Sequence, residues 1–131
     1  MAECCCSEND EVRLIYACSG AANTGFLADH VARNLAGADG AKMTCLAAMG
    51  ARLSGFLESA KSASANIMID GCSVSCGKKI FTDLGIGFDH YVITDYGVEK
   101  GKTKITESVI GEVTEKVRDA LKARTEAADD R

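Results

Sequence analysis

Cysteine is the residue type in this chain with the clearest capacity for chemistry, and there are 7 cysteines among the 131 residues. Two of them, Cys72 and Cys76, lie four positions apart, directly after an apolar run that ends at Asp70-Gly71. If a helix begins here, the two thiols share one helical face, and the positive end of the helix dipole favours their thiolate forms. Thiolate is the form that binds soft metal ions and attacks electrophiles. The spacing therefore predicts either a metal site or a reactive thiol.

The elements that would position these thiols alternate along the chain. Strands are predicted over residues 12–18, 42–47, 65–69 and 90–95, which are rich in β-branched, aromatic or other apolar residues. Helices are predicted after each of them from apolar residues spaced three and four apart. These markers are Phe26, Leu27, Val31 and Leu35; Leu53, Phe56, Leu57 and Ala60; Ile80, Phe81 and Leu84; and Val109, Val113, Val117 and Leu121. Thr106 is the expected cap of the last helix.

This alternation predicts a three-layer α/β fold of the flavodoxin or Rossmann-like kind, with a four-stranded parallel sheet and helices on both faces. Right-handed crossovers leave 2-1-3-4 as the expected strand order. In that order a ligand crevice lies at the carboxyl ends of strands one and three. Cys18 and Cys72 follow those two ends, Cys45 lies on the neighbouring strand two, and Cys76 lies one helical turn beyond Cys72. Adjacent strands are about 4.8 Å apart, which suits the sulfur separation of roughly 3.8 Å in a tetrahedral zinc site.

The composition indicates one globular domain in a reducing compartment. Residues 1–11 are polar apart from Cys4, Cys5 and Cys6 and predict a flexible arm; residues 12–123 form the α/β domain; residues 124–131 are expected to be a frayed tail. The net charge of −4 gives no reason to expect nucleic-acid binding. No apolar run approaches the roughly 20 residues of a membrane span, and no signal peptide is visible. We therefore expect a cytoplasmic protein, in which an odd number of cysteines favours metal ligands or working thiols over disulfides.

Three short motifs resemble those of the DGC-domain family, and they occur in that family's order over residues 14–96. They are Cys18-Ser19-Gly20, Cys45-Leu46-Ala47 and, above all, Asp70-Gly71-Cys72 followed by Cys76 and Lys78. Members of the family are small bacterial and archaeal proteins described as zinc-binding. The resemblance therefore implies Zn²⁺ held by Cys18, Cys45, Cys72 and Cys76, and it implies no established reaction. Proline often follows the Asp-Gly-Cys motif, whereas this chain has Ser73, which changes the rigidity of the turn and not the ligand chemistry.

Other interpretations of the same residues remain open. Any one of the four cysteines could act as a small buried apolar residue, and Asp70 could simply cap the turn. His30 and His90 are predicted to be surface residues rather than ligands, with His90 at the opposite end of the sheet. Lys78 and Lys79 are expected in solvent, although they could offset the charge of a four-thiolate site. Three phenylalanines are predicted to lie in the core, namely Phe26, Phe56 and Phe81.

Three classes of function follow from this pattern. The first is a zinc-binding protein, although four thiolates also suit another thiophilic metal or an iron–sulfur cluster. The second is a thiol enzyme or phosphocarrier with Cys18 or Cys72 as nucleophile, similar to low-molecular-weight phosphatases, arsenate reductases and the phosphocarrier B subunits of sugar transport systems. Residues 19–25 contain no arginine, so the phosphocarrier version fits better than the phosphatase. The third is a redox relay in which Cys18 or Cys72 attacks and another thiol resolves. A metal ion is the expected partner, and any small-molecule or protein partner is left open.

Overall fold

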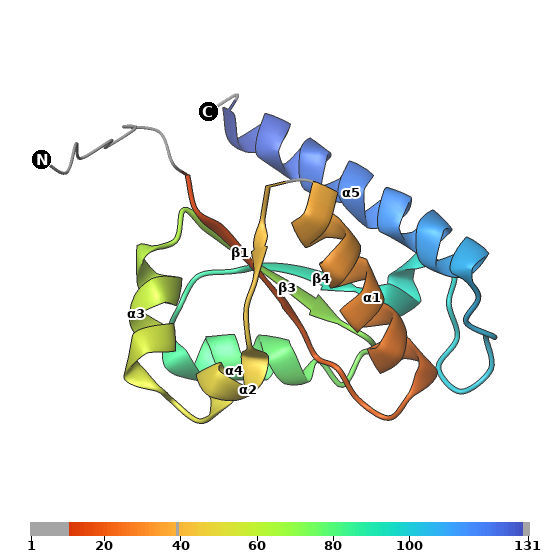
Figure 1. The fold of residues 1–131 in the computed structure, drawn as a ribbon, viewed down its shortest axis with the longest axis horizontal. Helices are drawn as coiled ribbons and strands as arrows, with labels where there is room; N and C mark the ends of the chain where they lie inside the picture. Colours follow the sequence, from red (N-terminus) through yellow and green to blue (C-terminus); the bar gives the residue numbers. More distant parts are fainter. Residues whose placement is uncertain (1–10, 39, 130–131) are drawn as a thin grey trace, which may run out of the picture.

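The computed structural model describes residues 11–38 and 40–129, which include a parallel four-stranded sheet (Figure 1). Its strands are β1 (Arg13–Ala17), β2 (Lys42–Met43), β3 (Ala65–Asp70) and β4 (Asp89–Val92), in the order β2-β1-β3-β4. Every pairing between them is parallel. The predicted fold class and strand order are confirmed. The three adjacent cysteines of the predicted arm, Cys4, Cys5 and Cys6, lie outside the described residues.

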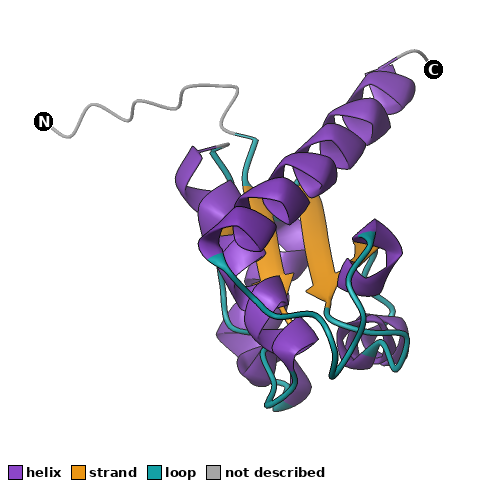
Figure 2. Ribbon diagram, turned by 90° about the vertical axis from the view of Figure 1, so that its right-hand side faces the viewer, coloured by secondary structure: helices purple, strands orange, loops and turns teal. Residues whose placement is uncertain are grey.

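Helices cover both faces of the sheet, as the alternation predicts. α1 (Asn23–Ala38) and α5 (Glu107–Asp129) lie on one face, while α2 (Leu46–Gly50), α3 (Ser54–Ser62) and α4 (Cys76–Leu84) lie on the other (Figure 1). A short 3₁₀ helix, η1 (Ile93–Tyr96), follows β4. A view turned by 90° shows the strands enclosed by the helices (Figure 2).

The sheet separates two hydrophobic clusters, because successive residues of a strand point to opposite faces. On β3, Ile67 and Ile69 belong to the cluster that includes α1 and α5, whereas Met68 packs with Phe81 of α4. Since both faces are covered, β1 and β3 are apolar along most of their length instead of alternating. The core is built from strand and helix side chains. None of the four candidate cysteines is fully buried in it, which disfavours a purely structural role for them.

Two aromatic residues predicted in the core are exposed instead. Phe26 is 50% exposed and Phe56 is 37% exposed, whereas Phe81 is buried as predicted. The Phe26 ring packs on His30 of the same helix, with ring centroids 4.2 Å apart. The helix predicted around Phe56 is α3. The strand predicted over 42–47 is shorter than expected, because α2 begins at Leu46, and α2 is separated from α3 near Arg52, which has a φ of 58°. Because β2 has only 2 residues, this edge of the sheet offers α3 little apolar surface to cover.

The last helix begins as predicted and extends further than predicted. Thr106 Oγ1 accepts a hydrogen bond from Val109 N at 3.2 Å, which caps the helix. α5 continues to Asp129, so residues 124–129 are helical where a frayed tail was expected. Arg124 Nε pairs with Asp89 Oδ1 at 3.0 Å and ties this part of α5 to the start of β4. In the part of the chain that the structure describes, no helix combines the length and apolar character needed to cross a membrane.

Candidate functional site

The four candidate cysteines lie at the carboxyl edge of the sheet. Cys18 directly follows β1, Cys45 follows β2 and precedes α2, Cys72 follows β3, and Cys76 is the first residue of α4. Because the strands are parallel, their carboxyl ends meet at one edge. All four residues are free thiols. The structure thus brings them to the edge where the strand order reverses, which is the placement that the sequence predicts.

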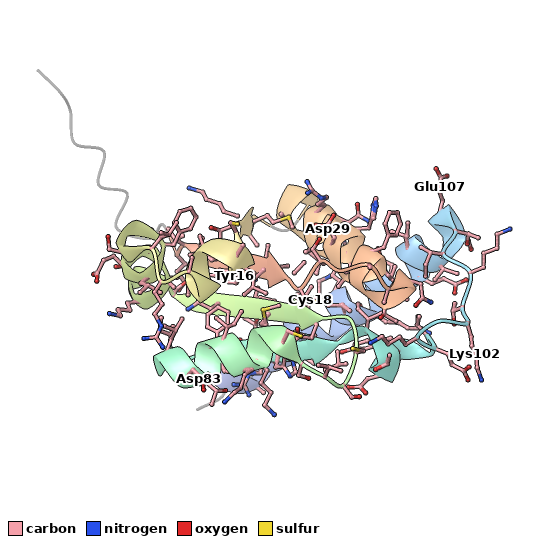
Figure 3. All side chains as sticks on the ribbon, turned by 90° about the horizontal axis from the view of Figure 1, so that it is seen from below. Tyr16, Cys18, Asp29, Asp83, Lys102 and Glu107 are labelled. Carbon is pink, nitrogen blue, oxygen red and sulfur yellow. The ribbon has the colours of Figure 1, made fainter. Side chains whose placement is uncertain are left out.

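Cys18 is a partly buried thiol. Its side chain contacts both hydrophobic clusters and lies between α1 and α4 (Figure 3). The sulfur accepts a hydrogen bond from Gly71 N at 3.1 Å. Burial raises the pKa of the Cys18 thiol, and the negative charges of Asp70, Cys72 and Cys76 raise it further, while the bond from Gly71 lowers it. Cys72 and Cys76 therefore both lie within electrostatic reach of Cys18.

The thiols fit a soft metal ion in their chemistry but are not drawn together into a closed centre. Across residues 11–38 and 40–129, no group of three or more His, Cys, Asp or Glu side chains is close enough to hold a metal ion. Cys45 is exposed at the start of α2 and is not among the charges that act on Cys18. A four-thiolate centre would need the segments that carry these residues to move closer. The placement of the four cysteines at one edge of the sheet was predictable from the strand positions, but the separation of their side chains was not.

Asp70 is a buried carboxylate that joins β3 to α4. It is 1% exposed and accepts hydrogen bonds from Gly77 N at 2.9 Å and Lys78 N at 3.0 Å. These are two of the free N–H groups in the first turn of α4, so Asp70 caps the helix, as its simpler interpretation predicts. Cys72 and Cys76 lie in the segment that this cap closes. Asp70 therefore holds the segment that carries two of the four thiols.

His90 was predicted to be a surface residue far from the cysteines, and this prediction is wrong. His90 Nε2 lies 2.7 Å from Asp70 Oδ2, and the His90 side chain is 20% exposed. The strand register explains the contact: His90 pairs with Met68, so it shares a face with Asp70, which lies two residues further along β3. The signal that could have predicted this contact was the register between β3 and β4, because a shift of one residue would turn His90 to the other face of the sheet.

Gly71 permits a close approach that no other residue would allow. A Cβ atom at this position would lie 2.7 Å from the backbone carbon and oxygen of Thr24, in the first turn of α1. The loop after β3 thus rests directly on α1, and Gly71 N reaches the Cys18 sulfur. In the Asp70-Gly71-Cys72 motif, the first residue caps α4, the second allows contact with α1, and the third presents a thiol between them.

Lys100 is a residue of the site that the sequence did not reveal. Its Nζ lies 3.5 Å from Cys72 Sγ, although the two residues are 28 positions apart. The lysines singled out from the sequence have other surroundings. Lys79 pairs with Asp83 at 2.9 Å on the exposed side of α4, and the Lys78 side chain is exposed. The cation beside a thiol thus comes from the loop after η1 and not from α4.

A cavity with a volume of about 730 Å³ lies at the opposite edge of the sheet. It is lined at the amino ends of β3 and β4 by residues such as Ser64, Asn66, Asp89 and Arg124. It contains no cysteine. In parallel α/β sheets ligands bind beyond the carboxyl ends of the strands, so the cysteine edge is the better candidate for a functional site.

Comparisons with known proteins agree with this architecture. Residues 14–117 match the family model described as the DGC domain. The chain is 36% identical over 72 residues to the anaerobic and virulence modulator AnvM of Pseudomonas aeruginosa, and the match covers 55% of this chain and 55% of AnvM. The match thus spans about half the length of that relative. No solved structure matches the chain. Because the family model covers most of the sequence, from β1 into α5, the chain belongs to the DGC-domain family.

Proposed function

We propose that this protein binds zinc or another thiophilic metal ion through Cys18, Cys45, Cys72 and Cys76 at the carboxyl edge of the sheet. The observation that supports this most is the placement of four free thiols after three neighbouring parallel strands, at one edge of the sheet. Several thiolates close together repel one another, and a bound cation relieves the repulsion. The thiols are free, so they are available as ligands.

In this proposal the metal site forms when the loops that carry the four thiols move toward one another. Cys18 and Cys72 flank the contact between Gly71 and α1, so they already belong to one unit. Cys45 has to approach from the start of α2, where it is exposed. A bound metal ion would supply positive charge in place of the thiol protons. Because the buried residues of the two hydrophobic clusters include none of these cysteines, we expect metal binding to be a function of the folded protein rather than a requirement for folding.

A thiol-based reaction with Cys72 as the nucleophile is the second candidate. The contact between Lys100 Nζ and Cys72 Sγ favours it, since a neighbouring cation stabilises a thiolate. Burial raises the pKa of the Cys18 thiol, which disfavours its nucleophilic thiolate form. A phosphocarrier or a redox relay remains within this class.

The name of AnvM, a modulator, favours a sensing or regulatory role for such a site over a metabolic reaction. We propose the same kind of role here, in the cytoplasm, where a reducing environment keeps the thiols free. The partner in this proposal is the metal ion itself, with neither nucleic acid nor membrane required.

Metal content tests the proposal against the thiol alternative. Protein purified without added metal, then titrated with zinc against a chromophoric chelator, is expected to bind one zinc ion per chain. Elemental analysis of the purified protein gives an independent measure of the metal. If zinc does not compete with the chelator and one cysteine reacts much faster than a free thiol, the thiol-based candidate replaces the metal site.

A further inference from the structure

The loop after η1 is fastened across the start of α1 by Asn23. Asn23 Nδ2 donates hydrogen bonds to Glu99 O at 3.1 Å and Thr103 O at 2.9 Å, and its Oδ1 accepts one from Gly101 N at 2.8 Å. Residues 97–103, which follow η1 and include these contacts, are called the 97–103 loop. Within it, Glu99 N donates to Thr103 Oγ1 at 2.8 Å. One side chain of α1 therefore fixes the backbone of a loop that is 76 to 80 positions away in the sequence.

This anchored loop presents Lys100 to Cys72. Lys100 Nζ lies 3.5 Å from Cys72 Sγ. Its neighbour Lys102 pairs instead with Glu99, at 3.8 Å. In the described part of the chain Lys100 forms no ion pair with a carboxylate. The carboxylate of the motif itself, Asp70, is bound by α4 and His90. The positive charge of Lys100 is thus directed at the thiol rather than neutralised by an acid.

We infer that Lys100 is a charge-selecting residue of the thiol site, which favours small anionic molecules that carry a thiol-reactive atom close to their charge. A cation within about 4 Å of the reacting sulfur attracts a negative group on the incoming molecule and leaves a neutral one unaffected. The inference rests on the second candidate function, in which Cys72 is a working thiol, and it applies to the metal-free protein. It assigns a chemical class of partner to Cys72: anionic rather than neutral or cationic.

Two alkylating reagents test this selection in metal-free protein. Iodoacetate and iodoacetamide both transfer their CH₂ group to the sulfur, which forms an S–C bond and releases iodide, and they differ in charge. Both react with the same thiolate, so the ratio of their rates at Cys72 cancels the fraction of thiolate. Mass spectrometry of the peptide that contains Cys72 gives each rate. In Lys100→Met the iodoacetate-to-iodoacetamide ratio is expected to fall about three- to tenfold, and added salt should lower the ratio in the unmodified protein.

Matched variants separate charge from structure. Lys100→Arg should keep the ratio, and Lys102→Met, an exposed position in the same loop, should leave it unchanged. Asn23→Ala should lower the ratio although Lys100 is retained, because the loop loses its three bonds to α1. An unchanged ratio in Lys100→Met, or an equal fall in Lys102→Met, would overturn the inference. Zinc titration of Lys100→Met reports separately on the metal proposal, so the failure of one is distinguishable from the failure of the other.

Discussion

A Cys72→Ser variant is expected to bind zinc at least about 100-fold more weakly than the unmodified protein while keeping its fold. Replacing even residues that support a ligand costs metal sites about 10- to 100-fold in affinity, and this change removes a proposed ligand itself. The fold should persist because the two hydrophobic clusters are built from strand and helix residues and not from Cys72. Chelator competition measures the affinity, and far-ultraviolet circular dichroism measures the secondary structure.

Ser73→Ala is the matched control, since Ser73 is the exposed neighbour of Cys72 in the same loop. It should bind zinc like the unmodified protein. A Cys72→Ser protein with a random-coil spectrum would mean that the metal is structural. Unchanged zinc affinity in Cys72→Ser would remove Cys72 from the ligand set.

Asp70→Ala is expected to lower the free energy of unfolding of metal-free protein by about 2–4 kcal/mol. The change leaves Gly77 N and Lys78 N in the first turn of α4 without their acceptor, and it leaves His90 without its partner. Gly77 is buried, so water cannot easily replace the carboxylate there. Urea denaturation, read as the shift in midpoint at constant slope, measures the loss.

Asp83→Ala provides the control for Asp70→Ala. Asp83 is exposed on α4 and pairs with Lys79, so its loss should cost no more than about 0.5 kcal/mol. Asp70→Asn, which keeps one carbonyl acceptor, should fall between the two. If Asp70→Ala were no less stable than Asp83→Ala, the cap and the contact with His90 would not hold α4 in place.

The fold was predictable because its signals are local and agree with one another. The apolar runs of β1 and β3 are typical of strands buried on both faces, and the spacing of Leu27 and Val31 is typical of a helix that covers such a sheet. Because the strands are predicted to be parallel, a cysteine that follows a strand is placed at the carboxyl edge of the sheet. Phe26 was misplaced because it lies beside the buried stripe of α1, and helical spacing did not separate it from Leu27 and Val31.

The contacts that complete the site depend on pairings between distant segments. The approach of His90 to Asp70 requires the register of β4 on β3, and β4 has only 4 residues. The position of Lys100 depends on Asn23, which binds a loop with no apolar pattern of its own. Neither pairing leaves a periodic trace in the sequence. The cysteines of the candidate site were therefore predictable, whereas the residues that surround them required the structure.

Site-resolved alkylation with and without one equivalent of Zn²⁺ tests the four-cysteine proposal most directly. In metal-free protein Cys45 and Cys76 are exposed and should label readily, whereas Cys18 should label slowly because burial raises its pKa. One equivalent of zinc is expected to protect all four cysteines, including Cys45, which the structure leaves apart from the others. Equal labelling of Cys72 with and without zinc, in protein that remains folded, would contradict the metal site.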